Sequence, residues 1–132
     1  MVELVDIEEM FGPGLAMPDP LPSGTGAYSP GWIRENGAWE TGADRFPAAI
    51  LLSEILAWPS EAVRQAASDG DAFFAEGEFG HDSRRSRLMH QTLGELHPRL
   101  AALFLQAWEA QSVEDCPRLV DWKPSAVAVS NA

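Results

Sequence analysis

Glycine and proline are concentrated near the start of this chain, and their distribution divides the sequence near residue 43. The 132 residues include 11 glycines and 10 prolines, and 12 of these lie in residues 1–42. This density disfavours regular helix and sheet over about thirty consecutive residues, and so long an irregular stretch in a compact domain usually has a function. Ahead of it, residues 2–7 mix β-branched and apolar side chains and predict a short strand, whose pairing partners must lie elsewhere.

The rest of the sequence is typical of helices, so we expect a mainly α fold. Residues 44–58 predict a helix with Asp44 as its N-cap and Pro47 in its first turn. Apolar side chains occupy nearly every face of this helix, as in a helix buried at the centre of a fold. Four later helices are expected, over residues 59–70, 82–96, 98–108 and 112–122, followed by a flexible tail over residues 125–132.

The composition indicates a single domain with a packed core and disfavours several kinds of partner. A hydrophobic fraction of 45% with five tryptophans is too high for intrinsic disorder. The formal charge of −11 argues against binding to nucleic acid or to an anionic membrane. The first residues lack the basic side chains of a secretory signal, and residues 46–58 are too short an apolar run to cross a bilayer. We therefore expect a cytoplasmic protein.

Few residues carry a distinct chemical signal. Asp6 follows the predicted strand, where a carboxylate can face a metal or a phosphate, although a solvated carboxylate is commoner there. Residues 24–29 superficially resemble a phosphate-binding loop but lack its third glycine and its lysine, so they predict a turn. The three histidines are not spaced as helical metal ligands, which leaves surface or helix-end positions for His81, His90 and His97.

The only cluster of positive charge is formed by Arg84, Arg85 and Arg87. It could meet a phosphate or an acidic partner, but in so acidic a chain we favour pairing with nearby carboxylates, those of Glu76, Glu78 and Asp82. The single cysteine excludes an internal disulfide and a cysteine-based zinc site. We expect a buried, inert thiol at Cys116.

The order of these features is more informative than any one of them. A strand ending in Asp6, a loop containing Gly-Thr-Gly-Ala-Tyr-Ser-Pro and an apolar helix opened by Asp44 follow one another, and Cys116-Pro117 and Trp122 come later. Together they resemble the C-terminal lobe of the protein kinase fold, in particular bacterial serine/threonine kinase-like proteins. The resemblance covers most of the chain and implies a strand with its Asp motif in residues 1–8, an activation-segment-like loop in residues 9–43 and a helical region in residues 44–123, together a partial lobe over residues 1–124.

The resemblance implies roles for particular residues. Asp6 matches the aspartate that holds Mg²⁺ against the phosphates of ATP. The stretch beside the peptide substrate is matched by Gly24, Thr25 and Tyr28. Asp44 matches a buried aspartate that holds the backbone of the catalytic loop. Structural positions near the end of the lobe are matched by Pro117 and Trp122.

Departures from the family pattern bear on activity. The glutamate of the Ala-Pro-Glu motif is replaced by Gly31, and its usual arginine partner is replaced by Cys116. One partner alone would leave a buried charge at a cost of about 3–5 kcal/mol, so their joint absence is consistent with the proposed register. Only five residues precede Asp6, and neither a phosphate-binding lysine nor a His-Arg-Asp loop occurs. We therefore expect no catalytic residue and no phosphotransfer by this chain alone, with Mg-ATP bound only if a missing N-lobe completes the fold.

The helix over residues 44–58 would lack the helix that normally covers it in the kinase fold. A second polypeptide, a second copy of this chain or a rearranged packing of the later helices would have to replace that cover. The alternative to kinase ancestry is a small acidic helical interaction module, in which Asp6 has no role. The two readings differ in whether Asp44 is buried at the start of a central helix.

Overall fold

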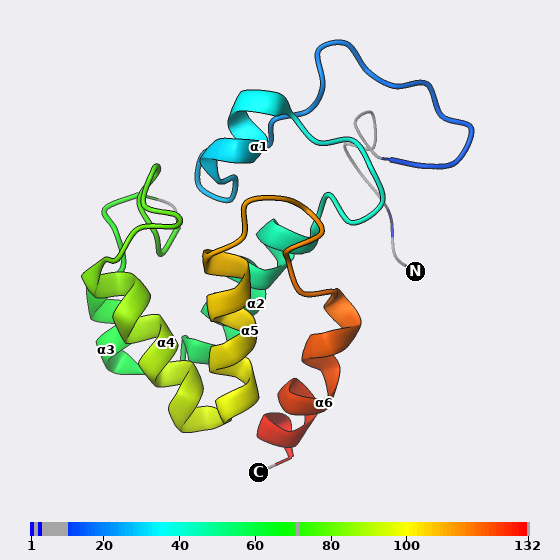
Figure 1. Ribbon diagram of the computed structural model, residues 1–132. Coiled ribbons are helices and arrows are strands. Elements are labelled where there is room, and N and C mark those ends of the chain that lie inside the picture. Colours follow the sequence, from blue (N-terminus) through cyan, green and yellow to red (C-terminus); the bar gives the residue numbers. More distant parts are fainter. Residues whose placement is uncertain (2, 4–10, 71, 132) are drawn as a thin grey trace.

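The computed structural model describes residues 1, 3, 11–70 and 72–131. Within these residues the fold is mainly α, with six helices and no strand (Figure 1). The predicted strand over residues 2–7 and the candidate metal ligand Asp6 lie outside the described residues. The helices are α1 (Gly31–Asn36), α2 (Arg45–Ala57), α3 (Glu61–Ala66), α4 (Arg84–Leu96), α5 (Pro98–Trp108) and α6 (Leu119–Ser130).

The sequence prediction that residues 9–43 contain no regular helix is wrong at α1. Five consecutive residues between Gly31 and Gly37 are neither glycine nor proline, which is enough for a short helix. Gly37 ends it with a φ of 69°, a conformation that a glycine adopts without strain, and its N–H donates to the carbonyl of Ile33 at 2.7 Å. Buried Ile33 joins α1 to the core.

Helix α2 is central, as predicted, but only one of its faces is buried. Figure 1 shows α2 passing behind α5, and it contacts α4, α5 and α6. The buried face consists of Phe46, Ala49, Ile50, Ser53 and Ala57. Leu51, Ile55 and Trp58 are 48%, 60% and 49% exposed, so the expectation of burial on every side is wrong. The later helices pack on one side of α2 only.

The starts of three later helices have clear local causes. The Ser60 side chain caps α3 by accepting from the N–H of Val63, and Ser83 and Ser86 form a reciprocal capping box at α4. Pro98 occupies the first turn of α5. The apolar stripe of this helix is entirely buried and consists of Leu100, Leu103, Phe104, Ala107 and Trp108. Helix α3 ends at Ala66, four residues before the predicted end at Gly70. Beyond Ala66 the chain turns into the loop, where the Ser68 hydroxyl donates to the carbonyl oxygen of Ala72 at 2.6 Å.

The end of the chain differs from the prediction. Residues 112–116 form a turn rather than a helix, because the Asp115 carboxylate accepts from the N–H of Gln111 and Pro117 cannot continue a helix. Helix α6 begins two residues later and continues to Ser130, so residues 125–130 are helical and the predicted flexible tail is wrong there. Burial of Trp122 and packing of Val129 on the core offset the hydrogen bond that Pro124 cannot donate.

Aromatic rings fill the core between α2, the loop after α3, and α5. Phe46 and Phe79 meet edge to face with centroids 5.1 Å apart, and Phe74 lies 4.7 Å from Trp108. Trp122 of α6 and Cys116 are both buried in the same core. In the part of the chain that the structure describes, no helix has the length and hydropathy of a membrane span.

Candidate functional site

Tyr28, at the end of the sequence stretch singled out above, is joined to the central helix. Its backbone N–H donates to the carbonyl of Thr25 at 3.0 Å, which closes the predicted turn. Its hydroxyl donates to Oε2 of Glu54 on α2 at 2.9 Å. Gly24 and Thr25 are exposed, and Gly24 has a φ of 68°. Tyr28 therefore fastens this exposed loop to α2.

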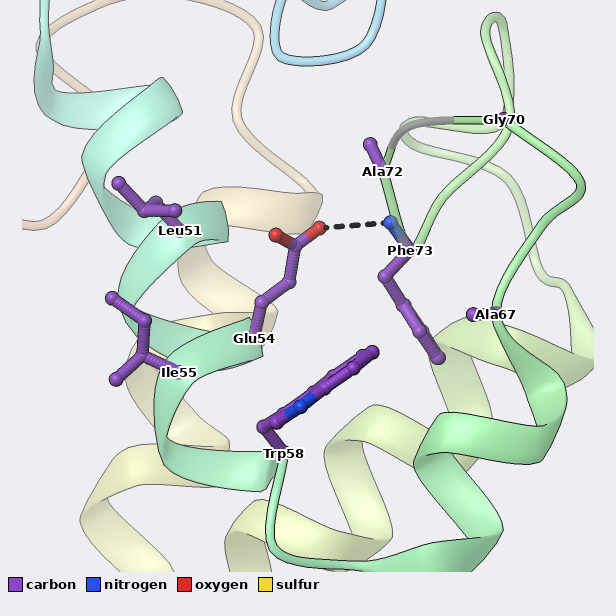
Figure 2. Close-up of a pocket in the computed structure, with 8 residues that line it drawn as sticks. All are labelled: Leu51, Glu54, Ile55, Trp58, Ala67, Gly70, Ala72 and Phe73. Carbon is purple, nitrogen blue, oxygen red and sulfur yellow. Dashed lines mark hydrogen bonds between the residues drawn. The ribbon is translucent and has the colours of Figure 1, made fainter.

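Glu54 also holds a second loop. Its other carboxylate oxygen, Oε1, accepts from the backbone N–H of Phe73 at 3.3 Å (Figure 2). One carboxylate thus connects residues 25–28, helix α2 and the loop between α3 and α4. Sequence reasoning missed Glu54 as a site residue, although it is the one charged side chain within the apolar run of residues 46–58.

The protonation of this junction is set mainly by burial. Burial raises the pKa of Glu54, while the hydrogen bonds from Tyr28 and Phe73 oppose that rise. Burial, followed by the hydrogen bond to Glu54, raises the pKa of Tyr28 to about 12. Tyr28 therefore remains a neutral phenol at neutral pH and acts as the hydrogen-bond donor.

An apolar pocket of about 410 Å³ lies beside the junction. Helix α2 contributes Leu51, Glu54, Ile55 and Trp58 to its lining, and the loop contributes Ala67, Gly70, Ala72 and Phe73. In Figure 2 the indole of Trp58 extends from the end of α2 toward Phe73, below Glu54. The pocket continues into the ridge of exposed side chains formed by Leu51, Ile55 and Trp58, which we call the α2 ridge.

Asp44 does not have the environment that was expected for it. It is the N-cap residue of α2, but it is exposed and its side chain accepts no capping hydrogen bond. Its φ and ψ of −83° and −1° are already helical, whereas a capping side chain usually requires an extended backbone. The expectation that Asp44 is buried is therefore wrong.

The remaining candidates are structural in this fold. Pro117 and Trp122 are buried. Burial, with a contribution from Asp115, raises the pKa of Cys116 to about 11, so its thiol is protonated and inert as expected. Within the described ranges no three side chains of histidine, cysteine, aspartate or glutamate come together as a metal site.

The arginine cluster is largely paired, as predicted. Arg85 lies 3.3 Å from Glu78 and Arg87 lies 2.7 Å from Asp82. Glu76 instead pairs with Arg34, at 2.6 Å. Comparisons with protein-family models, with curated proteins and with solved structures found no match to this chain.

Proposed function

We propose that this chain is part of a protein kinase-like C-terminal lobe, the half of that fold that carries the substrate-side loop. One observation supports the proposal above others: the hydrogen bond of 2.9 Å between Tyr28 and Glu54. It attaches the Gly-Thr-x-x-Tyr stretch to the helix that follows Asp44, which is where a kinase-like lobe needs a rigid support for its substrate loop. Packing of α5 on α2 agrees with the same arrangement.

The exposure of Asp44 counts against this proposal, because a kinase-like lobe was expected to bury it at the start of the central helix. In the family the corresponding aspartate binds the backbone of the catalytic loop, and the 132 residues contain no His-Arg-Asp loop. Without that loop Asp44 has nothing to hold. The proposal therefore assigns Asp44 a partner outside these 132 residues.

The α2 ridge supports the same proposal, because its apolar side chains are left exposed in these 132 residues. Leu51, Ile55 and Trp58 recur at the spacing of one helix face, and exposed apolar residues at such a spacing are typical of a helix-binding surface. We propose that a polypeptide with the missing kinase-like elements covers the ridge, and that residue Asp6 then faces Mg-ATP. Phosphotransfer requires the positioning and charge stabilisation that those elements supply.

The α2 ridge also favours a second candidate function, an acidic helical module that binds an unrelated protein. The two candidate functions differ in the role of Asp6, which faces Mg-ATP in the first and has no role in the second.

Binding should be tested by light scattering and co-purification with a polypeptide encoded beside this gene that contains a glycine-rich loop and a His-Arg-Asp motif. Formation of a heterodimer would support kinase ancestry. A stable monomer that unfolds cooperatively and does not bind this polypeptide would contradict it.

A matched pair of variants separates ridge binding from general loss of structure. Ile55→Glu places a charge on the exposed ridge and should abolish the heterodimer while leaving the thermal midpoint nearly unchanged. Leu105→Glu changes a side chain of α5 that is also exposed, at 40%, and should leave the heterodimer intact. Equal losses in both variants would exclude the α2 ridge as the binding surface.

A further inference from the structure

Helices α3 and α4 carry four of the chain's nine lysines and arginines, although the protein as a whole has a formal charge of −11. Arg64 lies on α3, and Arg84, Arg85 and Arg87 lie in the first turn and a half of α4. Figure 1 shows the two helices side by side, away from α6. This surface therefore differs in charge from the rest of the molecule.

Two of these arginines shape the surface between the helices. The Nε of Arg85 donates to the carbonyl of Ala66 at 2.7 Å, which ties the start of α4 to the end of α3. Its guanidinium also meets Glu78, whose side chain is largely buried. Arg64 donates to the carbonyls of Trp58 and Pro59 rather than to a carboxylate. Among the nearby carboxylates, Glu78 thus holds Arg85 in place and lines the same surface, whereas Glu61 and Asp82 are exposed.

Arg84 differs from its neighbours. It is exposed, and among the described residues no carboxylate lies within 4.0 Å of its guanidinium. An arginine without an intramolecular partner keeps all five of its N–H donors for a ligand. Arg87 contributes a second guanidinium, whose pair with Asp82 is open to solvent and contributes little energy.

Arg84 and Arg87 line a groove of about 770 Å³ between α3 and α4. Its base includes the apolar side chains of Ala66 and Leu88, and its walls include the amides of Gln65 and Gln91. Such a groove offers an apolar contact for the backbone and β-carbons of an extended peptide. The guanidinium groups of Arg84 and Arg87 match the carboxylates of that peptide. The side-chain amides of Gln65 and Gln91 already donate to Glu61 and Glu95.

We propose that this groove binds an acidic peptide segment of a partner protein. A short segment suits it better than a long polyanion, because charges beyond about 10 Å are screened at physiological salt and only groups near the groove contribute. A long nucleic acid would extend over the acidic remainder of the surface. The proposal does not depend on the kinase ancestry, because the side chains that line the groove come from α3, α4 and the loop between them, and the ridge residues Leu51, Ile55 and Trp58 are not among them. The groove and the apolar pocket share Ala67.

The test is fluorescence anisotropy of a fluorescein-labelled peptide of alternating glutamate and alanine, titrated with the full chain. We expect saturable binding that weakens as salt is raised, and Arg84→Glu should weaken it by about tenfold or more. Arg99→Glu is the matched control, because Arg99 lies at the opposite end of the α4–α5 hairpin and is also exposed. It should change the dissociation constant by less than about twofold.

Three outcomes would overturn the proposal. These are the absence of binding at low salt, an equal effect of the two arginine variants, and binding of oligouridylate as tight as that of the peptide. Circular dichroism of both variants checks that they fold, which is expected because Arg84 makes no hydrogen bond among the described residues that the substitution would break. Ile55→Glu, which disrupts the α2 ridge, should leave peptide binding unchanged. Failure of the peptide-groove proposal is therefore distinguishable from failure of the proposed kinase-like function.

Discussion

The hydroxyl of Tyr28 donates a hydrogen bond to Oε2 of Glu54 at 2.9 Å, across 26 residues of sequence. This bond is one of the few polar links between the glycine- and proline-rich first third of the chain and the helical remainder. Since Glu54 also accepts from Phe73, removal of its carboxylate would release two loops from α2 at once. The junction therefore organises the face of the molecule on which both the loop of residues 24–28 and the apolar pocket lie.

Removal of the Tyr28 hydroxyl should destabilise the protein modestly. Tyr28→Phe leaves one carboxylate oxygen of partly buried Glu54 without its protein donor, at an expected cost of about 1–2 kcal/mol. The measurement is urea unfolding followed by circular dichroism. Glu54→Gln is the control, because its amide oxygen can still accept one of the two bonds; Glu54→Leu should cost more than either. Equal stability of Tyr28→Phe and wild type would show that the bond does not hold the loop.

The stability contribution of Glu54 should depend on pH with a definite sign. Its pKa is raised in the fold from the usual value of 4.5, so the folded state binds more protons than the unfolded state between that value and the folded pKa. The free energy of unfolding contributed by this group therefore falls as pH rises through that window. The difference in stability between wild type and Glu54→Gln should shift in favour of the variant from pH 4 to pH 7, and a shift in the opposite direction would contradict the assignment.

The difference in burial between two isoleucines of α2 predicts a large loss of stability for one alanine substitution and a small loss for the other. Ile50 is fully buried, and Ile50→Ala should lower the free energy of unfolding by about 2–4 kcal/mol. Ile55 is 60% exposed, and Ile55→Ala should cost less than about 0.5 kcal/mol in the isolated chain. Thermal melts of the two variants provide the comparison. Similar losses of stability in the two variants would mean that the α2 ridge is already covered when the chain is purified alone, for example by a second copy of the chain.

Two glycines at the ends of α1 should respond oppositely to alanine. Gly31 lies in the first turn with no atom within 4 Å of an added Cβ, so Gly31→Ala should stabilise the protein by about 0.5–1 kcal/mol. Gly37 has a φ of 69°, and an added Cβ would lie 2.5 Å from Cβ of Leu21, so Gly37→Ala should be destabilising. Chemical unfolding midpoints of the two variants would test this; a stabilised Gly37→Ala would contradict the described end of α1.

The sequence predicted α2, α4 and α5 well because their signals are local. A proline or a serine marks the starts of α4 and α5, and the stripe from Leu100 to Trp108 has a clear helical period. Helix α1 was hidden by the surrounding glycines and prolines. Helix α6 contains Pro124 and depends on burial against the core, which a local pattern does not report.

The candidate site was predicted in part. Tyr28 was identified from its motif, but Glu54 was not, since its role arises from contacts with residues 26 positions before it and 19 positions after it. Burial of Asp44 was expected from the kinase resemblance and is not observed. Under the proposed kinase ancestry its partner would be the catalytic loop, and these 132 residues contain no His-Arg-Asp motif.

The rate of phosphate transfer from radiolabelled ATP to a generic protein substrate tests the central claim most directly. The purified chain alone should give no transfer, and a complex with a polypeptide carrying the glycine-rich loop, lysine and His-Arg-Asp motif should restore it. Asp6→Asn in the complex should abolish this transfer, because the proposed kinase ancestry assigns Asp6 to Mg²⁺. Turnover by the isolated chain, or full activity of the Asp6→Asn complex, would contradict the account.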